Sequence, residues 1–526
     1  MTATLTRLCA AAALLGAASA QPLAALRLRV EYLDGALAID VPAPRVSWAV
    51  AHGARAQAQS AYQVVFAALP SGAVAWDSGV VRSNRTLNVA YAGAAPLADD
   101  ADFSVTVTWW DAAGARAPAA STRFSTGLAA RASWAGAAFV AGAPRPAGAA
   151  SASAVGAFAD SLNMLRAEFT LAAAPVRARL FVAGFGYYRA FLNGAPTDAH
   201  VLGPFTTFEE RVLYDAADVL PLVRAGCNAL GVLLGAGWVA TPTVAAGNRS
   251  FAALLSVAYA DGSRASFASA LSAGAGALVF SSAASPVTLD DIYAGEAYDA
   301  RLEQPGFASC GFAPPPAAAP WLPAVAPAPD PLAGGAALSA HTIALGVDRA
   351  FAPVSISEPL PGIFVADFAQ NLAGQLALNV ICAAGPQTIR LSFAEMLFPE
   401  NGTVHNPYKN TAMQANFTCA GTGSVERYTT LFSWFGFRYA QIENWPGAPS
   451  ESNFEALFVH SLVEQTGALS TSSALLNRVQ HATRMASLSN LLDVPSDCPQ
   501  RERRGWLGDG QLSAETTIAN FDMAAL

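Results

Sequence analysis

The chain has 526 residues, of which only 13 % are charged, and its net charge is −8. One hydrophobic core does not extend over this length, so we expect roughly three or four domains. The acidic balance argues against a nucleic-acid partner, because binding to phosphates requires clustered Lys and Arg. A neutral or weakly charged ligand fits this composition better.

The first twenty residues have the pattern of a secretory signal peptide. Arg7 precedes an apolar run from Leu8 to Leu15, and Ala18-Ser19-Ala20 has the small residues of a cleavage site. The alternative is a short buried helix, but the run is too short to span a membrane and adjoins that site. We therefore expect residues 1–20 to be removed and the remainder to be secreted, with no membrane-spanning segment.

Removal of Cys9 with the signal leaves five cysteines without metal-ligand spacing, so we predict no zinc site. Cys382 and Cys419 flank one strand-rich segment and are candidates for a disulfide, with buried free thiols as the alternative. The histidines are scattered along the sequence and indicate neither a metal site nor a cofactor. They are His52, His200, His341, His405, His460 and His481.

Four N-x-[ST] sequons are compatible with a secretory route in a eukaryote, although such sequons are frequent by chance. They are Asn84, Asn248, Asn401 and Asn416.

The mature chain begins with a predicted β-sandwich of the fibronectin-III type over residues 21–128. Short strands separated by turn signals are expected at 26–32, 62–66 and 103–109. The Ala, Gly and Pro content of residues 135–150 then predicts a loose linker.

A second, larger sandwich is predicted over residues 129–342. One of its strands ends in Asn193-Gly194, a strong signal for a two-residue hairpin turn. A Pro-rich run at 314–331 separates this region from a third β region, which we expect at 343–464.

The hydrophobic period changes after residue 464. Apolar residues in 474–488 recur at helical spacing, and Pro495 and Pro499 prevent this helix from continuing. A second helical stretch is predicted at 510–526. The expected fold is therefore mostly β, with tandem β-sandwich domains followed by an all-α region that begins at 465.

The densest chemistry in the chain lies in the thirteen residues from Asp497 to Asp509, DCPQRERRGWLGD. A glycosidase needs one carboxylic acid to protonate the leaving oxygen and a second carboxylate to activate water or to attack carbon. Glu502 is the candidate acid, because Asp497 and Asp509 would help it to keep its proton, whereas Arg501 and Arg503 would oppose this.

Trp506, in the same segment, offers an apolar face to a sugar ring. The alternative is an ordinary connection between helices, in which Asp and Glu cap a helix and arginines pair with them on the surface. Composition alone leaves both interpretations open.

The segment Asp497–Asp509 closely resembles the D-C-P-Q-R-(D)-E-R-x-G-W-x-G-D signature of the α-L-rhamnosidases of glycoside hydrolase family 78. Similar segments follow the family's order, so the resemblance covers nearly all of the mature chain. They lie at 186–194, 226–238, 291–301, 365–374 and 434–439.

The resemblance implies β-sandwich domains, of the rhamnosidase N-terminal type at 129–342 and the concanavalin-like type at 343–464, followed by an (α/α)6 barrel. It implies hydrolysis of terminal α-L-rhamnosyl residues of glycosides or polysaccharides, with inversion. By residue match, Glu502 is the general acid, and the sugar is held by Asp497, Arg501, Trp506 and Asp509.

The family's general base is a glutamate further downstream than this chain reaches, and neither Glu515 nor Asp522 is a candidate for it. The resemblance therefore implies that these 526 residues are inactive by themselves and that the last segment is poorly folded. The competing hypothesis is a secreted, non-catalytic carbohydrate-binding protein built from the sandwiches.

Overall fold

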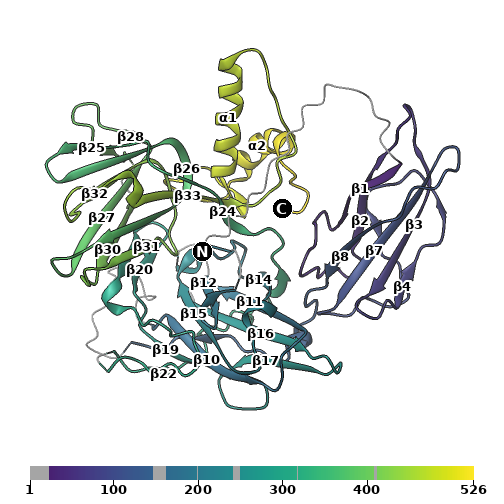
Figure 1. Ribbon diagram of the computed structural model, residues 1–526, viewed down its shortest axis with the longest axis horizontal. Helices are drawn as coiled ribbons and strands as arrows, with labels where there is room; N and C mark the ends of the chain where they lie inside the picture. Colours follow the sequence, from purple (N-terminus) through teal and green to yellow (C-terminus); the bar gives the residue numbers. More distant parts are fainter. Residues whose placement is uncertain (1–22, 146–160, 198–199, 241–248, 317, 408–410) are drawn as a thin grey trace. The chain divides into compact units, whose positions relative to one another are not determined.

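The computed structural model describes residues 23–145, 161–197, 200–240, 249–316, 318–407 and 411–526 (Figure 1). The expected signal peptide, the end of the expected linker and the sequon at Asn248 lie outside these residues. The described chain divides into two compact units. The first contains the residues up to 36 and 41–126, and the second contains 37–40 and 127–526.

The first unit is a sandwich of two antiparallel sheets around a core that includes Trp48, Phe66 and Trp109. One sheet has the strand order β1 (Ala24–Val30), β2 (Arg45–Ala51), β6 (Val89–Ala90). The other has the order β4 (Val74–Asp77), β3 (Gln59–Ala68), β7 (Asp102–Asp111), β8 (Ala120–Ser125), with β5 (Val81–Arg82) also paired to β3.

The predicted strands at 62–66 and 103–109 are confirmed within β3 and β7. The first predicted strand was placed too far along the chain, because β1 ends at Val30 and not at residue 32. Glu31 and Tyr32 have φ angles of 48° and 64°, and two successive residues in the left-handed region turn the chain out of the strand.

The second unit begins with two sheets packed face to face. One has the order β13 (Ala195–Pro196), β12 (Tyr187–Leu192), β15 (Gly226–Gly235), β10 (Met164–Leu171), β19 (Ser281–Ala283), β22 (Leu322–Pro323). The other has the order β18 (Ala277–Val279), β17 (Arg264–Ala270), β16 (Ser250–Ala258), β11 (Arg177–Phe185), β14 (Arg211–Asp218), β23 (Ala337–Ala340), with β9 (Val140–Ala141) also paired to β16. Their shared core includes Leu165, Val182, Leu234 and Phe251.

The structure of this sandwich tests three predictions made from the sequence. The Asn193-Gly194 turn between β12 and β13 is confirmed, and both residues have positive φ angles, 52° and 86°. The expected linker is wrong up to residue 145, because β9 lies in it and Phe139 and Val140 are buried. The Pro-rich run is also more than a separator, since β22 extends a sheet by pairing with β19.

A third sheet contains ten strands and carries the helices at its side (Figure 1). Its order is β20 (Val287–Asp291), β21 (Gly295–Asp299), β30 (Gln414–Cys419), β27 (Gln387–Ala394), β32 (Phe435–Glu443), β26 (Ile363–Ile381), β33 (Phe454–Ser461), β24 (Leu345–Phe351), with β25 (Ser355–Leu360) and β31 (Val425–Thr429) also paired to β26. A short ribbon, β28 (Met396–Leu397) with β29 (Val404–His405), lies outside it. The register of β26 on β32 shifts between Asp367 and Leu372, which marks a bulge.

The chain ends in two helices, α1 (Ala474–Ser489) and α2 (Leu507–Asn520), joined through the short strands β34 (Leu491–Leu492) and β35 (Val494–Pro495). The described chain is thus mostly β with helices at its end, as expected. α2 starts three residues earlier than predicted and stops at Asn520. Short 3-10 turns are η1 (Arg131–Trp134), η3 (Leu220–Leu222), η4 (Gly237–Ala240), η5 (Ala300–Leu302) and η6 (Glu451–Asn453).

The helices cover the third sheet with only part of their apolar surface. Met485 and Leu488 of α1 belong to the core of that sheet. Leu475, Leu476 and Val479 of the same helix are each more than half exposed, and Leu512 of α2 is 82 % exposed. Neither helix has the length and apolar character of a membrane span in the part of the chain that is described.

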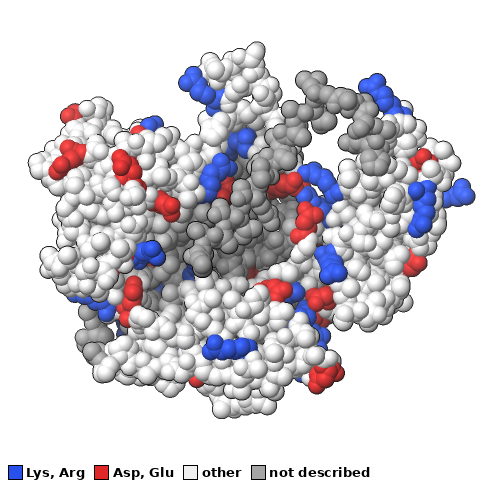
Figure 2. All heavy atoms as spheres, viewed as in Figure 1, with Lys and Arg blue, Asp and Glu red and all other residues white. Residues whose placement is uncertain are grey.

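Two disulfides link strands and loops of the second unit. Cys382 pairs with Cys419, which confirms the predicted possibility, and Cys227 pairs with Cys310, which the sequence did not indicate. Cys498 is a free thiol. On the face drawn in Figure 2, charged side chains are sparse and dispersed, in keeping with the low charged fraction of the chain.

A buried carboxylate joins β21 to the turn that precedes β32. Glu296 is 1 % exposed, and its oxygens accept hydrogen bonds from Tyr428 Oη (2.8 Å) and from the backbone N–H groups of Leu431 (2.9 Å) and Phe432 (2.7 Å). Burial raises the pKa of Glu296 to about 7, although these donors oppose the shift.

This raised pKa predicts that stability falls as the pH rises from 4.5 to 7, because over this range the native state keeps a proton that the unfolded state has released. Relative to Glu296→Gln, we expect the free energy of unfolding of the unmodified chain to fall by up to about 3 kcal/mol. Urea unfolding at several pH values measures this difference. If the free energies of unfolding of the two proteins change in parallel with pH, the raised pKa of Glu296 is contradicted.

Candidate functional site

The loop from Asp497 to Gly505 closes on itself before α2 begins. The backbone N–H of Asp497 donates to the carbonyl of Arg504 (3.0 Å), and the Arg504 N–H donates to Asp497 Oδ1 (3.2 Å). Ser496 and Gly505 form a β-bridge at its base. The loop therefore has a defined shape, with Glu502 in its turn.

Arg503 anchors this loop in the interior. Its side chain is buried, and Nη1 donates to the Ile292 carbonyl (2.5 Å). The guanidinium lies over the ring of Trp434, with its Cζ atom 4.9 Å from the ring centroid. Burial lowers the pKa of Arg503 to about 10. Sequence analysis grouped Arg503 with the charges around Glu502, whereas the structure uses it to hold the loop.

Two side chains from the β region support the backbone on either side of Glu502. Tyr293 Oη donates to the Glu502 carbonyl (2.9 Å) and accepts from Arg504 Nε (3.0 Å). Thr411 Oγ1 donates to the Arg501 carbonyl (3.0 Å). Sequence reasoning did not assign a role to either residue, although Tyr293 lies in the family-like segment 291–301.

Four of the five predicted site residues come together at the loop surface. One oxygen of Glu502 pairs with Arg501 Nη2 (3.0 Å), and the other accepts from Trp506 Nε1 (3.0 Å). Arg501 Nη2 is also 3.9 Å from Asp497 Oδ2. The side chains of Arg501 and Glu502 are 50 % and 38 % exposed, and Trp506 is 51 % exposed, so a ligand can reach the acid and the indole together.

Asp509, the fifth residue, stands apart from this network. It lies in the first turn of α2 and is exposed. Among the described residues its side chain has no hydrogen bond or ion pair, so it is available to a ligand from solvent.

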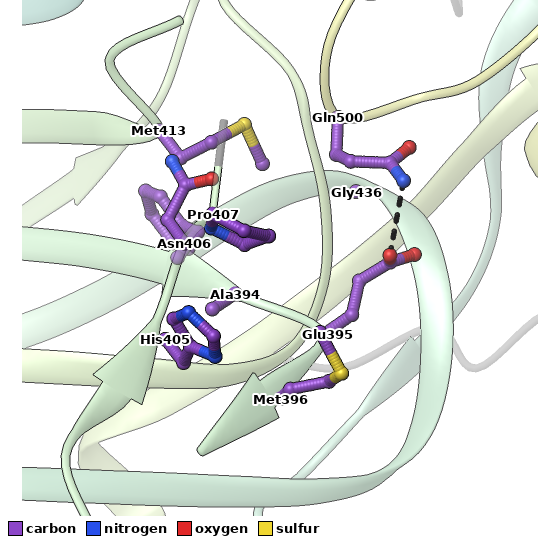
Figure 3. A pocket seen from close by; sticks show the side chains of 10 residues that line it. Ala394, Glu395, Met396, His405, Asn406, Pro407, Met413, Gly436 and Gln500 are labelled. Carbon is purple, nitrogen blue, oxygen red and sulfur yellow. Dashed lines mark hydrogen bonds between the residues drawn. The ribbon is translucent and has the colours of Figure 1, made fainter. Parts of the chain in front are cut away.

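A pocket adjoins the loop on the side of the third sheet (Figure 3). Gln500 points toward Glu395 and donates to its Oε2 atom (3.1 Å), while Asn371 from the β26 bulge donates to Oε1 (2.7 Å). Met396 and His405 line the same pocket. The bulge therefore helps to position the residue that precedes Arg501.

The histidines are not all scattered in space. His200 Nε2 and His341 Nδ1 both approach Asp215 Oδ1, at 3.1 Å and 2.8 Å. His341 Nε2 is 3.0 Å from Asp493 Oδ1, four residues before Asp497. Burial lowers the pKa of His341, but Asp493 and Asp215 outweigh it and raise the pKa to about 10.

Four family models match the chain in succession. They are described as the Rha78A-like N-terminal immunoglobulin domain at residues 25–130, the alpha-L-rhamnosidase N-terminal domain at 173–334, the bacterial alpha-L-rhamnosidase concanavalin-like domain at 358–460 and the bacterial alpha-L-rhamnosidase 6 hairpin glycosidase domain at 464–526.

Individual relatives agree with these matches. An α-L-rhamnosidase of Streptomyces avermitilis is 33 % identical over 382 residues, which are 70 % of this chain and 35 % of that protein. The structure of an α-L-rhamnosidase from Dictyoglumus thermophilum has a TM-score of 0.84 at 30 % identity, over 96 % of this chain and 56 % of the other. The corresponding Aspergillus terreus structure has a TM-score of 0.81 at 27 % identity, over the same shares.

The chain spans between about a third and a half of the length of the curated relatives that it matches. Within that span, the successive family models and the similarity in sequence and fold agree with the motif around Glu502. The chain belongs to the α-L-rhamnosidases of glycoside hydrolase family 78.

Proposed function

We propose that this chain supplies the general acid and part of the sugar pocket of a secreted, inverting α-L-rhamnosidase. The observation that carries the proposal is the arrangement of Glu502 between Arg501 and Trp506 on an anchored, exposed loop. In this assignment Glu502 protonates the glycosidic oxygen of a terminal α-L-rhamnosyl residue. The substrate is a rhamnose-containing glycoside or polysaccharide.

The neighbours of Glu502 have complementary roles in this assignment. Trp506 presents an apolar ring face to the sugar, and Asp497, Arg501 and Asp509 bind its hydroxyl groups. Because Arg501 is half exposed, it can turn from Glu502 to a hydroxyl when the sugar enters. No metal or cofactor takes part in this reaction as we propose it.

The second carboxylate of the reaction is not assigned to any residue of this chain. Inversion needs a general base on the opposite face of the sugar, at a distance that leaves room for water. Glu515 lies in α2 and Asp522 just after it, and neither is a candidate. We propose that α1 and α2 begin a six-hairpin domain whose further helices cover exposed residues such as Leu475 and Leu512.

Three observations favour secretion. The first twenty residues have the order of a signal peptide, and two disulfides require an oxidising compartment to persist. The sequons at Asn84 and Asn401 are exposed, as glycosylation requires. The proposed domain limits are 21–128, 129–342, 343–464 and 465–526, although β20 and β21, within 129–342, pair into the third sheet.

The first test is an assay of these 526 residues by themselves with an aryl α-L-rhamnoside. We expect no release of rhamnose, because the assigned site contains an acid but no base. Turnover by this chain would contradict the assignment. Retention on a rhamnose-rich polysaccharide column is expected both for a partial rhamnosidase site and for a non-catalytic carbohydrate-binding protein. Rhamnosidase activity in a form with a complete six-hairpin domain distinguishes these two hypotheses.

In such a complete form, Glu502→Gln is expected to lower kcat by about 10²- to 10⁴-fold on substrates with poor leaving groups. The loss should be much smaller on an activated aryl rhamnoside, whose leaving group needs little protonation. Comparison of the two substrates measures the effect, with Glu515→Gln as the control. Equal losses on both substrates would exclude Glu502 as the general acid.

Asp497→Asn and Asp509→Asn should weaken rhamnose binding, each by roughly tenfold, because a charged acceptor is lost at a sugar hydroxyl. Calorimetric titration with L-rhamnose and the kcat/KM for an aryl rhamnoside should change together. If binding is unchanged for Asp509→Asn, this exposed carboxylate does not contact the sugar.

A further inference from the structure

A buried cluster of two imidazoles and one carboxylate lies outside the rhamnosidase motif. Its members are His200, Asp215 of β14 and His341, which directly follows β23. Their side chains are 16 %, 3 % and 7 % exposed. One nitrogen or oxygen of each converges, so that all three atoms lie within 4.8 Å of one another.

The converging atoms are close to the positions that ligands of one metal ion would occupy. Asp215 Oδ1 is 3.1 Å from His200 Nε2 and 2.8 Å from His341 Nδ1. Two ligands of a tetrahedral ion with bonds of about 2.1 Å lie about 3.4 Å apart. Outward movements of a few tenths of an ångström would therefore admit the ion.

The residues around the cluster hold two of the three candidate ligands in place. His341 Nε2 lies 3.0 Å from Asp493 Oδ1, and the other oxygen of Asp493 accepts from the Phe205 backbone N–H (2.9 Å). The Tyr188 hydroxyl donates to Asp215 Oδ2. A histidine whose second nitrogen donates to a carboxylate is the usual support of a metal-bound imidazole.

We propose that His200, Asp215 and His341 form a binding site for a divalent transition metal ion of the zinc class. Two imidazoles and a carboxylate suit zinc, with water at a fourth position, whereas Ca²⁺ requires six or more oxygen ligands. The ion is structural, since no residue of the Asp497–Asp509 motif ligates it. It ties β14 and the segment after β23, through His341 and Asp493, to the chain just before the motif.

Without a metal, the same geometry is that of a protonated His341 that donates to two carboxylates, Asp215 and Asp493. A measurement of zinc binding distinguishes this arrangement from a metal site. The experiment uses untagged, non-reduced chain, because a polyhistidine tag binds zinc and because reduction of Cys227–Cys310 would create thiol ligands beside Glu168. After removal of metal with a chelator, Zn²⁺ is added, excess is dialysed away, and bound zinc is measured by elemental analysis.

We expect about one zinc ion per chain, and an affinity at least about 100-fold weaker in His341→Gln and Asp215→Asn by competition with a chromophoric chelator. Asp493→Asn leaves all three ligands and should weaken binding by about 10- to 100-fold. His52→Gln is the matched control, since His52 also contacts a buried aspartate, Asp111 (3.2 Å), and it should bind zinc normally. Cys498→Ser should also bind normally, which excludes the free thiol as the source.

Failure of the unmodified chain to retain zinc, or equal retention by the ligand variants, would overturn the proposal. If His341→Gln does not fold, Co²⁺ replaces Zn²⁺ in the unmodified chain and in Asp493→Asn. Visible absorption bands of a nitrogen- and oxygen-ligated Co²⁺ that are displaced by one equivalent of Zn²⁺ support the site, and their absence overturns it. Neither measurement depends on rhamnosidase activity.

Discussion

The burial of one guanidinium determines how the Glu502 loop is presented. Arg503 extends away from the loop surface into the interior, where it meets the carbonyl of Ile292, the sulfur of Met413 and the face of Trp434. A buried charge is costly unless it is paired or solvated by such dipoles and rings. Because these contacts hold Arg503 in the interior and Tyr293 contacts the residues on either side of it, Glu502 and Arg504 are held against the β region.

The third sheet provides the rest of that support. Tyr293, whose hydroxyl contacts both Glu502 and Arg504, lies in the turn between its paired strands β20 and β21. Asn371, in the bulge of β26, donates to Glu395. Glu395 in turn accepts from Gln500 (Figure 3). Glu502 thus lies in a loop between two helices, and contacts from the third sheet and its turns support this loop.

Much of this organisation could be predicted, because the signals are local. The period-two pattern of β7, the Asn193-Gly194 turn and the helical period of α1 each depend on neighbouring residues in the sequence. The motif from Asp497 to Asp509 was recognisable for the same reason. Predictions failed where a residue contacts segments that are distant in the sequence. Phe139 and Val140 were predicted to lie in a linker, but both are buried and Val140 pairs with β16, more than a hundred residues away.

The sequence by itself determined the mostly β composition, the change to helix near residue 474 and the cluster of acids, arginines and tryptophan around Glu502. Only the tertiary structure decided that Arg503 is an anchor and not a partner of Glu502, that Tyr293 and Thr411 support the loop, and that His200 and His341 meet at Asp215. The physical reason is that burial and long-range pairing set the role of a polar side chain, and neither is encoded by spacing along the chain.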